Sequence, residues 1–270
     1  MGRLIFFMLV FFSCVQLNAQ DTIFRYDLKK TFPGNYSDFT VDELGNIIYV
    51  VNSMQLKKFG REGDSIGVYN DVKRYGNIHS VDASNPFKIL VFYKTTATIV
   101  ILDRLLGVKQ VIDLRKNNIL GAKAIKQSYD NNIWVFDELE NKIKKIDDNG
   151  KLLSESADLR NVFAEAPSFE WIFDDNRSLY LYDEKQGWFV FDYYGAFKRK
   201  YAFTGWKDVQ LLGDVMMGRD ANKIFVAKTG GLDYSRFNSN ISYAAVVKTL
   251  QVKKLRYVLY ADRLEIYDAP

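Results

Sequence analysis

The sequence predicts an all-β fold built from a repeated four-stranded unit, and three observations carry that prediction. Glycines recur at Gly63, Gly107, Gly150 and Gly195, so that successive spacings are 44, 43 and 45 residues. An apolar, strand-like run precedes each of them, at 56–59, 99–102, 143–146 and 188–191. Turns rich in Asp and Asn precede another apolar run in most units. A period of about 40 to 50 residues made of short strands is typical of the blades of a β-propeller.

Residues 1–19 are predicted to be a signal peptide, and residues 20–270 a single propeller domain. Arg3 supplies the basic start, residues 4–12 form an apolar run, and Ala19 offers a small residue at the cleavage point. The run is shorter than the roughly 20 apolar residues that span a bilayer, so no transmembrane segment is expected. A second interpretation is lipidation at Cys14. Either way we expect an exported protein of the periplasm, with an outer-membrane association left open.

Composition excludes several classes of function. The sequence holds 37 Lys and Arg against 33 Asp and Glu, and its basic residues are scattered through strand patterns, so no nucleic-acid surface is expected. About 250 mature residues can bury roughly three-quarters of the unfolded chain's surface, so a core without disulfides is feasible.

The first four units each contain four predicted strands. These lie at 37–41, 47–51, 56–59 and 65–69; at 79–81, 89–93, 99–102 and 108–114; at 124–128, 133–136, 143–146 and 152–159; and at 169–173, 179–182, 188–191 and 197–203. Asn, Asp and Gly suit the tight turns between them. The second strands are apolar without alternation, which indicates that both faces are covered, as in a blade between two neighbours. The more charged fourth strands suit an exposed edge.

The last two units are less regular. Unit five is expected at 215–219 and 224–227, with its last strands within 234–245, and unit six at 246–252, 255–260 and 264–267. Unit six then lacks an outer strand, while residues 22–28 precede unit one and resemble the fourth strand at 108–114. We therefore expect six blades, with the ring closed by the N-terminal strand; five or seven blades remain alternatives.

The segment 41–50, with 56–59 and Gly63, resembles an NHL-type propeller repeat, roughly D-x-x-G-N-I-Y-V followed by I-x-x-F and G. Residues 130–135 and 143–150 repeat the pattern in unit three. The resemblance implies the fold and leaves function open, because such propellers include scaffolds, receptors and hydrolases. Six-bladed relatives of the gluconolactonase kind hold a divalent metal in the central channel through Glu, Asn and Asp, but no residue here is assigned to that set.

Few residues point to catalysis. His79 is the single histidine, which excludes motifs that pair histidines on a metal. It begins a first strand, so it is a candidate for the channel mouth, although a structural role is the stronger interpretation. Acidic pairs occur at 147–148, 174–175 and 183–184, in turns rather than facing each other as glycosidase chemistry requires. No catalytic residue, metal site or cofactor is predicted.

Aromatic residues are concentrated in unit four, where fourteen lie between Phe169 and Trp206. Most are expected to pack between blades. Tyr193, Tyr194 and Trp206 fall at turns or strand ends and are the candidate partner-binding residues, because exposed Tyr and Trp suit protein contacts. The sequence thus favours a non-catalytic periplasmic propeller that binds a protein partner, such as an outer-membrane secretion or transport complex. The alternative is a gluconolactonase-like hydrolase or a propeller that binds sugar or another small molecule.

Overall fold

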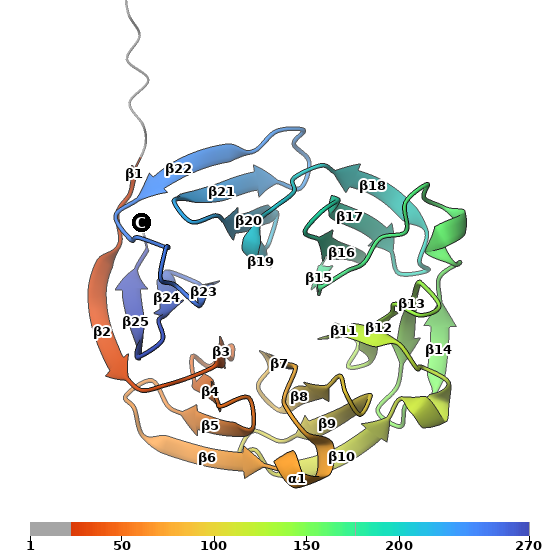
Figure 1. Ribbon diagram of the computed structural model, residues 1–270, viewed down its shortest axis with the longest axis horizontal. Coiled ribbons are helices and arrows are strands. Elements are labelled where there is room, and N and C mark those ends of the chain that lie inside the picture. The colour runs from red at the N-terminus through yellow and green to blue at the C-terminus, as the bar shows by residue number, and fades with distance from the viewer. Residues whose placement is uncertain (1–22, 176, 270) are drawn as a thin grey trace, which may run out of the picture.

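The computed structural model describes residues 23–175 and 177–269, and its strands form a closed ring of six antiparallel sheets (Figure 1). Each sheet is a blade whose first strand lies nearest the ring axis and whose fourth lies at the rim. The fold is a six-bladed β-propeller.

Blades 1 to 4 follow the chain in order. Their strands are β3 (Asp38–Val41), β4 (Ile47–Val51), β5 (Gln55–Phe59) and β6 (Ser65–Asn70); β7 (Ser80–Asn85), β8 (Lys88–Tyr93), β9 (Thr98–Leu102) and β10 (Val108–Asp113); β11 (Ala122–Gln127), β12 (Ile133–Asp137), β13 (Lys142–Ile146) and β14 (Leu152–Glu155); and β15 (Trp171–Asp175), β16 (Ser178–Asp183), β17 (Gly187–Asp192) and β18 (Phe197–Tyr201). Three short helices, α1 (Val72–Tyr75), η1 (Arg115–Asn117) and η2 (Leu159–Asn161), lie in the connections between these blades.

Blades 5 and 6 depend on the N-terminal segment. Blade 5 contains β19 (Lys207–Leu212), β20 (Val215–Arg219), β21 (Lys223–Lys228) and β22 (Ser235–Ser239), and β1 (Ile23–Phe24) pairs with β22 in parallel. Blade 6 contains β23 (Lys248–Val252), β24 (Leu255–Leu259) and β25 (Arg263–Asp268), and its rim strand is β2 (Asp27–Pro33). The predicted closure by an N-terminal strand is therefore confirmed.

Each interface between blades contains its own apolar cluster, which explains the continuous apolar strands of the sequence. In β8, Leu90 and Phe92 pack with blade 3, whereas Ile89, Val91 and Tyr93 pack with blade 1. Successive side chains of a strand point to opposite faces, so a strand between two blades faces an apolar cluster on both sides. All six residues of β8 are buried.

The closing strand lies further along the chain than expected. The sequence placed it at 22–28; Thr22 is outside the described residues, and β2 spans Asp27–Pro33 instead. The cause is Asn240, whose side chain accepts from the backbone N–H of Tyr26 at 2.9 Å and donates to its carbonyl at 2.9 Å. These bonds hold the segment between β1 and β2, so the N-terminal segment joins two blades rather than one.

Blade 5 also differs from its prediction. The strand at 215–219, expected to come first, is the second, and the innermost strand is β19 (Lys207–Leu212). The sequence of β19 begins Lys207-Asp208 and includes Gln210, so it lacks the apolar run that marks other strands. Polar residues are tolerated there because the innermost strand lines the channel cavity, and only Val209 and Leu211 of β19 pack into the apolar cluster between blades 4 and 5.

The periodic glycines lie in the turns between the third and fourth strands, where each turn packs against the rim of the preceding blade. Gly195 has a φ of +81°, and a Cβ atom there would lie 2.6 Å from Ser156 Cβ and 2.8 Å from its Cα. The position therefore needs glycine both for its conformation and for the contact. Asp192 begins this turn and accepts from the backbone N–H of Ala196 at 2.9 Å.

Replacing Gly195 by alanine should destabilise the ring more than the same change at Gly213. Gly213 also has a positive φ, +59°, but no atom lies within 4 Å of the position that a Cβ would take there. We expect a loss of about 1 kcal/mol for Gly213→Ala from backbone conformation, and about 3 kcal/mol for Gly195→Ala because the contact between blades is also disturbed. Urea unfolding of both variants measures the difference. Equal losses would show that the contact is unimportant.

Candidate functional site

The six innermost strands, β3, β7, β11, β15, β19 and β23, surround a central cavity of about 650 Å³. All six start at the same face of the ring, because each runs in the same direction through its antiparallel blade. We call the residues at these strand starts the channel mouth. It includes Asp38, His79, Lys123, Glu170, Trp171 and Lys248. The opposite face is made of the turns between first and second strands and between third and fourth strands, and we call it the turn face.

Ion pairs join neighbouring blades at the channel mouth. Lys248 Nζ lies 2.6 Å from Asp38 Oδ1, which connects blade 6 to blade 1. Lys123 Nζ lies 3.0 Å from Glu138 Oε1 and 3.1 Å from Glu170 Oε1, which connects blade 3 to blade 4. Burial lowers the pKa of Lys123, but the two carboxylates outweigh that effect and raise it. Lys123 is therefore held in its charged form.

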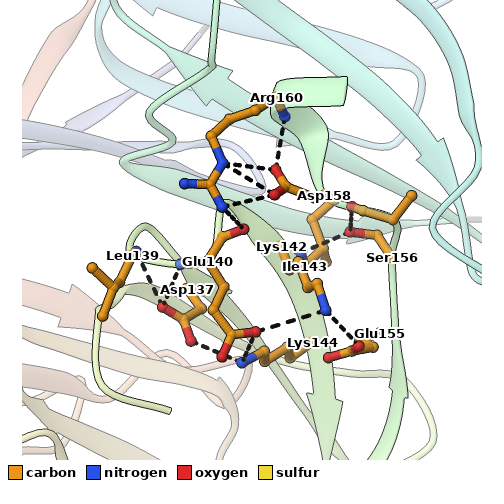
Figure 2. A network of polar contacts seen from close by, with 11 residues as sticks. Asp137, Leu139, Glu140, Lys142, Ile143, Lys144, Glu155, Ser156, Asp158 and Arg160 are labelled. Carbon is orange, nitrogen blue, oxygen red and sulfur yellow. Dashed lines mark hydrogen bonds and ion pairs between the residues drawn. The ribbon is translucent and has the colours of Figure 1, made fainter. Parts of the chain in front are cut away.

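The loop that carries Glu138 is fixed by a polar network (Figure 2). Asp137 Oδ1 accepts from the backbone N–H of Leu139 at 3.1 Å, and the buried Lys144 ammonium lies 2.8 Å from Asp137 Oδ2 and 3.0 Å from Glu140 Oε2. Arg160 Nη2 donates to the Glu140 carbonyl at 3.2 Å. The loop is thus attached to both its own blade and the following connection, which holds the backbone that carries Glu138.

His79 lines the channel cavity at this mouth. Its ring makes an edge contact with Phe92, with centroids 5.6 Å apart, and it hydrogen-bonds to the backbone of Lys123. Burial and the charge of Lys94 lower its pKa, an effect larger than the opposing one of the Lys123 backbone. His79 is therefore mostly a neutral imidazole at pH 7, and it is exposed to solvent at the mouth.

The turn face carries a group of aromatic rings at the junction of blades 3 and 4. Tyr129 and Tyr193 stack with centroids 5.2 Å apart and an interplanar angle of 11°. The Lys145 ammonium lies 4.8 Å from the Trp134 ring centroid, 5.3 Å from that of Tyr193 and 5.8 Å from that of Tyr129, and it pairs with Asp130. Cation–π attraction and the ion pair together hold these rings in place.

Asp174 anchors the same group from blade 4. Its Oδ2 accepts from Ser128 Oγ and from Trp134 Nε1, both at 2.9 Å, and its other oxygen accepts from the Tyr193 hydroxyl. Burial and the neighbouring Asp174 carboxylate raise the pKa of Tyr193, so the phenol stays protonated. The acidic pair 174–175 thus contributes an aspartate that organises aromatic rings.

Two further aromatic side chains extend this surface. The first is Tyr194, next to Tyr193, which is 89% exposed; the second is Phe87. Tyr129 of the stacked pair is itself 68% exposed. Phe87 is also exposed, in the first turn of blade 2, and the neighbouring Asn85 donates to Asn131 at 3.4 Å in the corresponding turn of blade 3. We call Phe87, Tyr129, Tyr193 and Tyr194 the aromatic patch.

The structure separates the three sequence candidates for partner binding. Tyr193 and Tyr194 belong to the aromatic patch. Trp206 does not, because it is only 2% exposed and stacks on Phe203 with centroids 5.5 Å apart, inside the interface between blades 4 and 5. Trp206 is therefore corrected to a core residue. Sequence reasoning missed Phe87 and Tyr129, although a large aromatic side chain among the Asn, Asp and Pro residues of a turn is a usable signal of exposure.

Neither a cluster of metal ligands nor a long apolar helix occurs in the described part of the chain. Within residues 23–175 and 177–269, no three His, Cys, Asp or Glu side chains come together as a metal site would require. Over the same residues, no helix has the length and apolar character needed to cross a membrane.

The ring is similar to known propellers in structure but not detectably in sequence. No protein-family model and no curated protein matches the chain. Virginiamycin B lyase from Staphylococcus aureus aligns with a TM-score of 0.60 at 11% identity, over 88% of this chain and 99% of the lyase. PorZ of Porphyromonas gingivalis aligns with a TM-score of 0.56 at 13% identity, over 92% of this chain and 39% of PorZ. BamB of Moraxella catarrhalis aligns with a TM-score of 0.52 at 12% identity, over 93% of this chain and 94% of BamB. At these identities the likeness establishes the fold alone.

His79 should make the protein sensitive to mild acid. Because its native pKa is lowered from 6.5, the unfolded chain binds a proton below that pH that the native chain does not, so the free energy of unfolding falls as pH falls. Between about pH 7.5 and pH 5.5, wild type should lose more stability than His79→Gln. Lys94→Met should lessen the loss by removing a repulsive charge. Parallel stability curves for wild type and His79→Gln would contradict this assignment.

Proposed function

We propose that this protein is a non-catalytic, exported propeller that binds a protein partner in the periplasm as an accessory subunit of an outer-membrane secretion or transport complex. The observation that carries the proposal is the aromatic patch. Tyr129 and Tyr193 are held in position by the Lys145 ammonium, and Asp174 fixes the Tyr193 hydroxyl, so binding need not order these two rings. Tyr194 and Phe87 are exposed to solvent. Aromatic side chains that lose little conformational entropy are typical anchors of protein interfaces.

Two structural neighbours support the envelope context. PorZ is described as an essential bacterial surface component of the type-IX secretion system, and BamB shares the ring over nearly its whole length. The predicted signal peptide at residues 1–19 agrees with that context. The support comes from shared architecture, and the role in a complex is our proposal.

Crosslinking from the patch tests the proposal. A photo-crosslinking amino acid at position 194 should capture one reproducible partner from envelope fractions, whereas the same group at position 139, an exposed leucine on the opposite face, should not. The double variant Tyr129→Ala/Tyr194→Ala should weaken binding of the captured partner about tenfold or more, because each anchor contributes about 1 kcal/mol or more.

Stability provides the control for that experiment. Tyr194 and Tyr129 are largely exposed, so the double variant should unfold at nearly the wild-type urea concentration. Failure to capture any partner from position 194, or equal capture from positions 194 and 139, would remove the patch as the binding surface.

A second candidate function is favoured by the channel cavity with His79 at its mouth. It is a propeller that binds a sugar or another small molecule, or a gluconolactonase-like hydrolase. Metal analysis of the purified protein and a lactone screen separate these two forms: a stoichiometric divalent ion with lactone hydrolysis supports the hydrolase, and a ligand bound without turnover supports the binding protein.

A further inference from the structure

We propose that the channel mouth binds a neutral, hydroxyl-rich carbohydrate, with Trp171 as the surface on which a sugar ring stacks. This proposal rests on the second candidate function, a propeller that binds a small molecule, and names the class of that small molecule. The carbohydrate site uses none of the residues of the aromatic patch, which lies on the opposite face, so a protein partner and a carbohydrate could bind to the same ring.

Trp171 differs from every other tryptophan of the chain. It lines the cavity at the start of β15 and is 40% exposed, whereas Trp134, Trp188 and Trp206 are buried. Those three rings contact other aromatic rings, while the Trp171 ring contacts no aromatic ring of the described residues. A flat apolar ring with one polar N–H, left open at the mouth of a cavity, suits the C–H face of a sugar ring.

Charge balance at the mouth favours a neutral ligand. The acidic residues that line the cavity are paired: Asp38 with Lys248, Glu170 with Lys123, Asp82 with Lys126 and Asp208 with Arg219. Lys94 is the lining lysine outside these pairs. Burial raises the pKa of Glu138, but Ser168, Lys123 and Lys94 together lower it. Glu138 is the second carboxylate beside Lys123, and the positive charge of Lys94 offsets its negative charge. An ionic ligand would therefore add an uncompensated charge.

The same side chains can satisfy hydroxyl groups. Each hydroxyl both donates and accepts, and the mouth presents ammonium donors at Lys94 and Lys248 beside carboxylate acceptors at Glu170 and Asp38. Lys123 pairs with Glu138, and the loop that carries Glu138 is held by the network of Figure 2, so part of this frame is ordered before any ligand binds. A cavity of about 650 Å³ falls within the usual size range of small-ligand sites.

Tryptophan fluorescence provides a direct test, because a soluble quencher should reach Trp171 and not the three buried tryptophans. The probes are neutral oligosaccharides of N-acetylglucosamine, glucose and mannose in different linkages, with inorganic phosphate and citrate as anionic probes. We expect at least one neutral oligosaccharide to reduce the quenching of tryptophan fluorescence by acrylamide. Phosphate and citrate should not reduce it.

Three variants identify the site. Trp171→Ala should weaken binding of that oligosaccharide about tenfold or more in calorimetry, since stacking on an aromatic ring contributes on the order of 1–3 kcal/mol. Trp171→Phe should restore part of the affinity. Leu139→Ala, which changes an exposed side chain on the same face outside the cavity, should bind as wild type does.

Three results would overturn the inference. The first is that none of the neutral probes protects the protein at about 10 mM, a concentration far above common small-ligand dissociation constants. The others are equal protection by phosphate or citrate, and wild-type affinity of Trp171→Ala for the oligosaccharide. None of them bears on crosslinking from position 194, so this inference and the protein-binding proposal fail or stand separately.

Discussion

Burial of both faces of the middle strands is the constraint on which this ring depends. Each blade is covered on two sides, and each of the six apolar clusters is shared by two adjacent blades. No blade can therefore bury its apolar side chains alone, and an open ring would leave two apolar faces in water. Closure of blade 6 by β2 removes that cost. The two hydrogen bonds from the Asn240 side chain to the backbone of Tyr26 hold the N-terminal segment where β2 can complete blade 6.

A lysine near the end of the third strand contacts the turn of the next blade in both blade 1 and blade 3, but the group it meets there differs. In blade 1, the buried Lys58 lies 2.9 Å from Asp42 and donates to the carbonyl of Arg104 in the turn of blade 2. Lys145 occupies the corresponding position in blade 3 and reaches the turn of blade 4, where it meets the ring of Tyr193 instead of a carbonyl. The aromatic patch is thus built on a contact that elsewhere only holds blades together.

The two ends of the channel differ because different loops form them. The turn face consists of tight turns, and Lys145 and Asp174 hold the stacked rings of Tyr129 and Tyr193 there. The channel mouth is formed by strand starts and the longer connections between blades, and its charges are paired across blade boundaries. A rigid ring can therefore offer aromatic rings at one end and a cavity with paired charges at its mouth at the other, without any conformational change.

Much of the fold was predictable from local patterns, and the candidate sites were predictable only in part. Residues 89–93 of strand β8 are all apolar, so the burial of both faces of this strand could be inferred directly from the sequence. Strand β19 could not be predicted in the same way, because only Val209 and Leu211 face the apolar cluster and its polar residues make the sequence resemble a loop. Tyr194 was recognised from its turn, but Trp206 was misplaced, since a strand-end position does not show whether a neighbouring blade covers the ring.

The sequence alone determined the period, the blade type and the need for a closing strand, because these follow from side-chain alternation and turn chemistry within one unit. Only the tertiary structure decided which residues meet across blades. Tyr129 and Tyr193 are 64 residues apart in the chain and stack in space, and Asp38 and Lys248 meet only when the ring closes. Such contacts depend on the packing of whole blades, which no local pattern encodes.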